Sequence, residues 1–115
     1  MSGGNWKEMF NAACEGDLAL LGYHVRSGAD VNYAHPEFLA TPLVASILAK
    51  QEGAALYLLA NGANPHLLSE FDGLTPAQAA DQAGLAAVAQ RLRDMGVPAA
   101  ASSHAPRRWW SRLLA

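Results

Sequence analysis

Four histidines are the residues of this 115-residue chain whose side chains could bind a metal ion. Histidines that hold zinc usually come at short spacings and together with cysteines. The histidines here lie far apart, with no His-x-x-His pair and no nearby run of cysteines: His24, His35, His66 and His104. We therefore predict that they are surface residues and that the chain binds no metal.

Cys14 and the acidic pair Glu70 and Asp72 are the remaining candidates for catalysis. We expect Cys14 to be a buried, unreactive thiol at the end of a short helix, because no histidine–acid arrangement is evident near it. An acid pair in a loop acts as general acid and base only within a cleft, and without one it is usually a solvated surface feature. No Gly-rich phosphate loop follows a strand. The sequence thus predicts no enzyme and no cofactor.

The composition is that of one soluble domain, with 51% apolar and 16% charged residues. No stretch approaches the roughly 18 uninterrupted apolar residues of a membrane span. A single cysteine excludes an internal disulfide and suits a reducing cytoplasm, where we expect the protein to reside. The alanine-rich composition suggests a bacterial source. A net charge of −2 argues against nucleic-acid binding.

Charge is distributed unevenly along the chain. Residues 107–115 contain three arginines and no acid, whereas residues 1–106 contain five basic and ten acidic side chains, a balance of −5. Between them, residues 98–106 are small residues bounded by prolines, which is the composition of a flexible linker. We predict a folded domain over residues 5–97, a linker over 98–106 and a basic Trp-rich tail over 107–115.

Landmarks recur every 34 residues within the folded part. The sequence Gly-Ala-Asp at 28–30 recurs as Gly-Ala-Asn at 62–64, and Gly96 follows at the same interval. Thr-Pro at 41–42 recurs as Thr-Pro at 75–76, and each stands 21 residues before its glycine. Because two independent landmarks share one period, we predict an internal repeat. Its approximate units are 5–35, 36–69 and 70–97.

Each repeat is predicted to form two helices. Thr41 and Thr75 suit the N-cap position, and the proline after each suits the first helical position, where no N–H is required. Gly16 and Gly84, each nine residues past the threonine position, end the first helices. Apolar residues at spacings of three and four mark the second helices. A glycine follows each second helix: Gly28, Gly62 and Gly96.

This pattern resembles the ankyrin repeat, whose hallmarks are a Thr-Pro start, a glycine in mid-repeat and a Gly-Ala-Asp-Val-Asn ending. The resemblance covers residues 6–97 and implies an all-α, ankyrin-like solenoid of three helix–loop–helix repeats. The first repeat keeps the ending but has Lys7 at the threonine position. Val44 and Gln78 replace a histidine with which family members often brace the loop, and Lys50 replaces the mid-repeat glycine of the second repeat.

The resemblance implies that the chain binds a partner protein through a concave face made of loop tips and first helices. Carried over by position, the tips are residues 33–39 and 67–74, which combine apolar and aromatic side chains with acids. That composition is common at the centre and rim of interfaces. We predict a monomeric adaptor or inhibitor whose partner is unidentified. Its partner-binding residues would be Tyr33, His35, Glu37, Phe38, Leu68, Glu70 and Phe71.

Two interpretations of the tip aromatics stay open. Phe38 and Phe71 either are exposed to a partner, or fold back over the loops and pack on each other. At the start of the chain, Trp6, Met9 and Phe10 are expected to cover the first helix pair, because an end repeat must seal its core. On the second helices, we expect three large side chains to be packed: Tyr23, Leu56 and Tyr57.

The tail is amphipathic if it is helical, because Trp109 faces Leu113 and Trp110 faces Leu114 at the i, i+4 spacing. It could settle on an anionic membrane surface, enter a partner's groove, fold back onto the acidic body of its own chain, or pack its tryptophans on the last repeat. Peripheral membrane association is the alternative function. The residues that would carry it are Arg107, Arg108, Trp109, Trp110, Arg112, Leu113 and Leu114.

Overall fold

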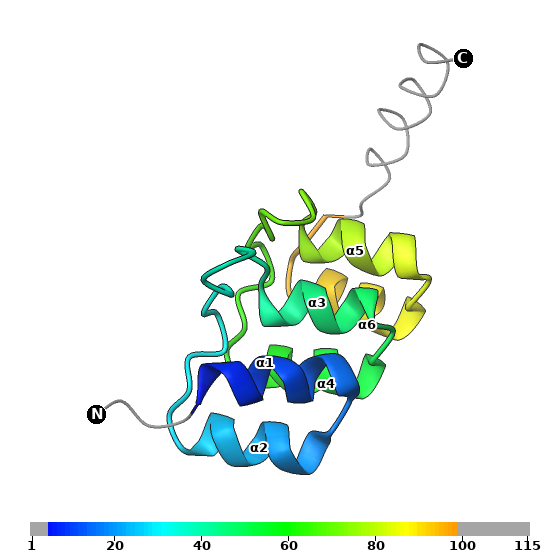
Figure 1. Cartoon of the computed structure of the whole chain (residues 1–115). Helices are drawn as coiled ribbons and strands as arrows, with labels where there is room; N and C mark the ends of the chain where they lie inside the picture. Colours follow the sequence, from blue (N-terminus) through cyan, green and yellow to red (C-terminus); the bar gives the residue numbers. More distant parts are fainter. Residues whose placement is uncertain (1–4, 99–115) are drawn as a thin grey trace.

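The computed structural model describes residues 5–98, which fold into three antiparallel helix pairs. The first helices of the pairs are α1 (Trp6–Glu15), α3 (Pro42–Leu48) and α5 (Pro76–Ala83). The second helices are α2 (Leu18–Arg26), α4 (Glu52–Ala60) and α6 (Ala86–Asp94). The pairs stack so that α1, α3 and α5 form one layer and α2, α4 and α6 the other (Figure 1). The predicted all-α solenoid of three helix–loop–helix repeats is confirmed.

Two parts of the sequence prediction lie outside the described residues. These are the tail, 107–115, and the linker beyond Pro98. Within residues 5–98, no helix is both long and apolar enough to cross a membrane.

The helices begin where the capping residues are. The Thr41 side chain accepts a hydrogen bond from the Val44 N–H at 3.2 Å. Thr75 forms a capping box, in which Gln78 accepts from the Thr75 N–H at 3.0 Å and donates its own N–H back at 3.3 Å. Helix α1 begins at Trp6, earlier than the register with Thr41 suggests, because the Asn5 side chain caps it. The local chemistry of the cap therefore takes precedence over the repeat register at this end.

The turn between the two helices of each repeat requires a left-handed residue. Gly16 and Gly84 have φ angles of 77° and 74° at this position, as predicted. Lys50 occupies the equivalent position of the second repeat and adopts a φ of 61°. A residue with a Cβ atom is strained in this region, by about 1–2 kcal/mol. The second repeat therefore keeps the turn geometry at an energetic cost.

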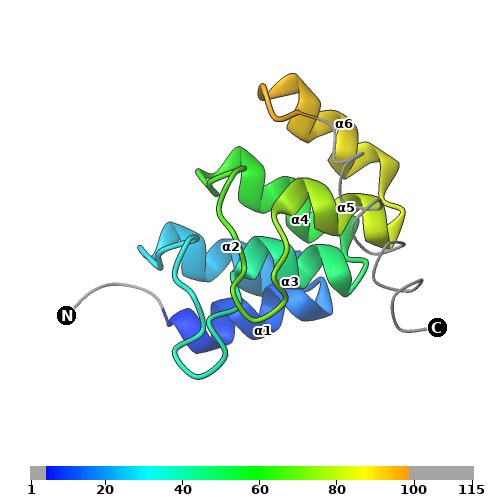
Figure 2. The same ribbon diagram turned by 90° about the horizontal axis from the view of Figure 1, so that it is seen from above.

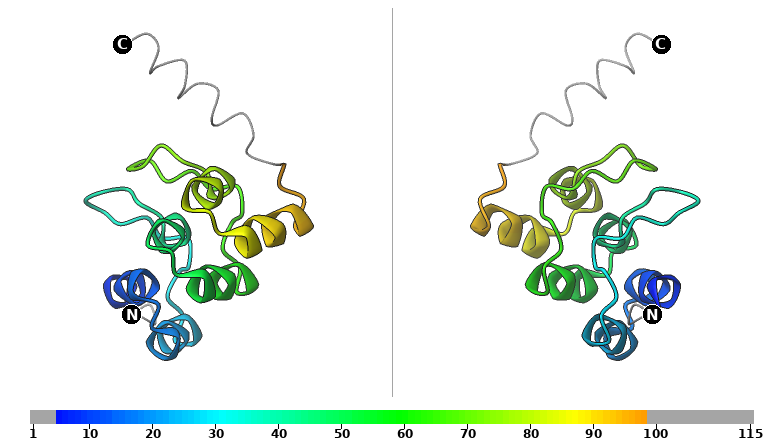
Figure 3. Two further views of the ribbon diagram at one scale, coloured as in Figure 1. Left: turned by 90° about the vertical axis from the view of Figure 1, so that its right-hand side faces the viewer. Right: turned by 90° about the vertical axis from the view of Figure 1, so that its left-hand side faces the viewer.

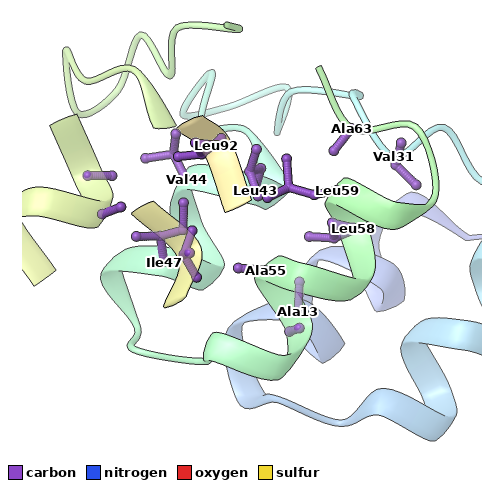
Figure 4. Close-up of a cluster of buried hydrophobic side chains, with 14 of the residues drawn as sticks. Ala13, Val31, Leu43, Val44, Ile47, Ala55, Leu58, Leu59, Ala63 and Leu92 are labelled. Carbon is purple, nitrogen blue, oxygen red and sulfur yellow. The ribbon is translucent and has the colours of Figure 1, made fainter. Parts of the chain in front are cut away.

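A single core runs along the stack between the two layers. In its centre, Val44 and Ile47 of α3 lie near Ala55 of α4 and Leu92 of α6 (Figure 4). Met9 and Leu21 close the core in the first repeat and are fully buried. Pairs of buried alanines allow the helices to approach closely. They are Ala12 and Ala13, Ala54 and Ala55, and Ala79 and Ala80.

Two predicted environments on α2 are wrong. His24 is not a surface residue: it is 6% exposed, and its Nε2 atom lies 3.0 Å from a Glu8 carboxylate oxygen of α1. Tyr23, expected to be packed, is 58% exposed. Its equivalent one repeat later, Tyr57, packs against the core, with its hydroxyl beside Gly22 of the preceding repeat. Tyr23 has no preceding repeat to cover it, so the end position leaves it in solvent.

Candidate protein-binding surface

Two hairpins connect the helix pairs and have the same geometry. We call residues 33–40 the first hairpin and residues 67–74 the second. The His35 N–H donates to the Ala40 carbonyl at 2.8 Å, and the Ser69 N–H, one repeat later, donates to the Leu74 carbonyl at 2.9 Å. Both hairpins project from the layer of first helices, away from the second helices (Figure 3). The predicted loop tips thus lie side by side at one edge of the concave face.

Leu39 is the strained residue of the first hairpin. Its φ angle is 61°, and the equivalent residue of the second hairpin is Gly73, with a φ of 67°. The Leu39 side chain is 46% exposed, so packing does not account for a leucine at this position. The sequence analysis counted Leu39 as a tip residue but did not select it for binding. The signal that was available is its register with Gly73.

Hydrogen bonds join the two hairpins. The Leu39 carbonyl accepts from the Glu70 N–H at 3.1 Å and from the Phe71 N–H at 3.4 Å. Ser69 is fully buried, and its hydroxyl accepts from the Thr41 N–H at 3.3 Å and donates to Asp72 Oδ2 at 2.9 Å. These bonds brace the loops without the histidine that Val44 and Gln78 replace. The hairpins therefore form one joined unit.

Aromatic rings form a continuous strip from α1 to the second hairpin. Phe38 and Phe71 have ring centroids 5.5 Å apart, and His35 stacks on Phe38 at 4.4 Å. Phe10 and Trp6 of α1 contact His35 at 5.3 Å and 5.1 Å. We call these residues, together with Tyr33, which contacts Trp6 at 5.5 Å, the aromatic strip.

Both interpretations of the tip aromatics hold at once. Phe38 and Phe71 pack on each other, yet they remain 49% and 64% exposed. Met9 seals the first repeat as expected. Trp6 and Phe10 are half-buried and do more than cover the first helix pair, because they also contact the first hairpin. The structure brings the predicted residues of both loops onto the joined hairpins, while the candidate tail residues lie outside the described chain.

Carboxylates surround the aromatic strip. The two hairpins contain Glu37, Glu70 and Asp72 and no lysine or arginine. Beside Phe71, a pocket of about 390 Å³ has apolar walls from Leu48 and Leu74, with Asp72 and Gln82 completing its lining. This volume falls in the range of ordinary ligand pockets, roughly 300–1,000 Å³. The surface can therefore accept apolar side chains and adjacent cationic ones.

The other candidate residues support no chemistry at this surface. Burial, and secondarily the negative charge of Glu15, raises the pKa of the half-buried Cys14 thiol. The thiol is consequently protonated at neutral pH and a poor nucleophile, as the sequence analysis predicted. Within residues 5–98, no three His, Cys, Asp or Glu side chains are grouped so that they could hold a metal ion.

Solved structures provide the decisive comparison. The crystal structure of the human ASB11 ankyrin repeat domain matches with a TM-score of 0.69 and 28% sequence identity, over 78% of this chain. The fold is an ankyrin-like repeat solenoid. This solenoid spans 40% of the length of the ASB11 structure. No protein-family model matches the sequence, and no curated protein matches it either.

The comparison also supports the general class of activity. Ankyrin repeats form solenoids whose stacked units present an extended concave surface for binding. Domains of this fold are typically non-catalytic scaffolds that bind other proteins. The ankyrin-like fold of this chain is thus that of a protein–protein interaction module.

Proposed function

We propose that the chain is an adaptor or inhibitor that binds one partner protein through the joined hairpins. The observation that carries this proposal is the exposure of an aromatic patch on a braced structure. Phe38 and Phe71 touch each other, so the patch is held in place before a partner arrives. Binding to a preformed patch avoids the entropic cost of ordering flexible loops.

The composition of the surface supports a specific kind of partner surface. Large, rigid aromatic side chains supply much of the binding energy at interfaces when they are buried at the centre. Around Phe38 and Phe71, the carboxylates of Glu37, Glu70 and Asp72 form an acidic border. The complementary partner surface is an apolar protrusion flanked by lysine or arginine.

Leu39 belongs to the same patch under this proposal. A leucine with a φ of 61° costs stability, and its exposed side chain returns little of that cost to the fold. Glycine would serve the hairpin better, as Gly73 does in the second one. Retention of leucine is explained if its side chain contacts the partner.

The test is affinity capture from native lysate with a double variant, Phe38→Ala plus Phe71→Ala. The matched control is Leu18→Ala plus Tyr23→Ala on α2, since those side chains are 47% and 58% exposed and lie away from the hairpins. We expect the hairpin variant to lose the partner and the α2 variant to retain it. A partner that is captured equally by both variants contradicts the proposal.

A further inference from the structure

The hairpin surface has an unusual balance of charge and apolar area. Besides the three carboxylates of the hairpins, the neighbouring helices α3 and α5 contribute Asp81 and no lysine or arginine. The apolar area consists of Phe38, Leu39 and Phe71, continued by the Leu48 and Leu74 walls of the pocket. An occupant that complements this surface must be cationic and rich in large apolar side chains.

The chain itself contains one segment of that chemistry. Residues 107–115 carry three arginines, two tryptophans and two leucines, with no acid. We propose that this tail docks on the hairpin surface of its own chain and covers the patch formed by Phe38 and Phe71. Docking does not require the proposed function to be correct. Its consequence, competition with a partner for the same surface, rests on that function.

The tail can reach the hairpins from the end of the described chain. Helix α6 runs antiparallel to α5, so Pro98 lies at the end of the stack where the second hairpin enters α5 (Figures 1 and 2). Packed helices lie about 8–10 Å apart. Residues 99–106 precede the tail, and eight residues can span up to about 26–29 Å. The connection is therefore long enough for docking within one chain.

Docking within one chain is favoured over docking on a second copy. A short connection holds the tail at an effective concentration in the millimolar range. A second chain reaches that concentration only in concentrated solution. The tail is consequently expected to occupy the hairpins of its own chain.

Apolar contacts are expected to contribute more than ion pairs to this docking. Exposed ion pairs between arginine and carboxylate contribute little individually and are screened by salt. Trp109 and Trp110 can bury large surfaces against Phe38, Phe71 and the pocket walls. Replacing both tryptophans by alanine should therefore abolish docking, while added salt should only weaken it.

Paramagnetic NMR on the full chain tests the proposal. A nitroxide is attached at Ser111→Cys in a Cys14→Ser background, and the ¹⁵N-labelled amide signals are compared with those of the reduced, diamagnetic sample. We expect selective broadening at Phe38, Leu39 and Phe71, with signals of Leu18 and Tyr23 unaffected. Adding Trp109→Ala and Trp110→Ala to the labelled chain should remove the broadening at the hairpins.

A second measurement avoids the cysteine substitutions. Amide chemical shifts of the unmodified full chain are compared with those of the Trp109→Ala plus Trp110→Ala chain. We expect differences concentrated in residues 37–39 and 70–74, with the helical signals of α2 unchanged. This comparison remains informative if the Cys14→Ser background does not fold.

Three results would overturn the proposal. One is the absence of both hairpin broadening and hairpin shift differences. Another is broadening found only when spin-labelled chain is mixed with ¹⁵N-labelled, unlabelled-spin chain, which indicates a second copy. The third is tail-dependent sedimentation with vesicles containing anionic lipid and no effect on the hairpins, which indicates a membrane surface.

These results are distinguishable from failure of the proposed function. Partner capture that depends on Phe38 and Phe71 can persist when the tail does not dock. If both proposals hold, deletion of residues 99–115 should increase partner capture, because the competing tail is gone.

Discussion

Lys50 is the position at which a single substitution should stabilise the fold. It has a φ of 61° where the other two repeats have Gly16 and Gly84 in the same turn. Relief of the left-handed strain is worth about 1–2 kcal/mol. Glycine gives back about 0.5–1 kcal/mol through the greater freedom of the unfolded chain. Lys50→Gly should therefore raise the free energy of unfolding by about 0.5–1 kcal/mol.

The chain also offers the reciprocal substitution as a control. A Cβ atom at Gly84, whose φ is 74°, would meet no heavy atom within 4 Å. Gly84→Lys should therefore lower stability through backbone strain alone, by a similar amount. The combined variant should return close to the stability of the parent chain, because the two turns lie in different repeats.

The assay is urea unfolding followed by circular dichroism, together with a thermal melt. For a domain of this size, the expected gain for Lys50→Gly corresponds to a rise of about 2–8 °C in the melting temperature. The Gly84→Lys melting temperature should fall by a comparable amount. An unchanged or lowered stability of Lys50→Gly would refute the argument that this turn is strained.

Three further predictions concern the hairpins and the thiol. Leu39→Gly should raise the free energy of unfolding by about 0.5–1 kcal/mol and yet weaken partner capture; urea unfolding and capture on one preparation check both, and unweakened capture removes Leu39 from the interface. Ser69→Ala should cost about 1–3 kcal/mol in urea unfolding, because the buried Thr41 N–H loses its acceptor; an unchanged midpoint would mean that the hairpins are held otherwise. Cys14 should react with iodoacetamide more slowly than a free cysteine at neutral pH, and faster as rising pH approaches its raised pKa or once urea unfolds the chain; equal rates in the folded and unfolded chain would contradict its burial.

The repeat period made the fold predictable. Thr-Pro and glycine landmarks 34 residues apart specify where helices begin and end, because caps and left-handed turns are local chemistry. The same landmarks placed the two hairpins and hence the candidate binding residues. Local chemistry of this kind can be read without tertiary context.

Features that depend on neighbouring repeats were not predictable. Tyr23 and Tyr57 occupy the same register, yet one is exposed and the other packed, because only Tyr57 has a preceding repeat. His24 is buried against Glu8 for a reason that no spacing along the sequence reveals. The contact of Trp6 with the first hairpin likewise depends on how the layers stack.

The most direct test of the proposed function is photo-crosslinking from the hairpin itself. A photoreactive phenylalanine analogue is placed at Phe71, which is 64% exposed, and in a separate chain at Tyr23, which is 58% exposed. After illumination in the native cells, we predict one protein crosslinked from position 71 and not from position 23. Crosslinks from position 23 alone, or the same products from both positions, would contradict a partner-binding site on the hairpins.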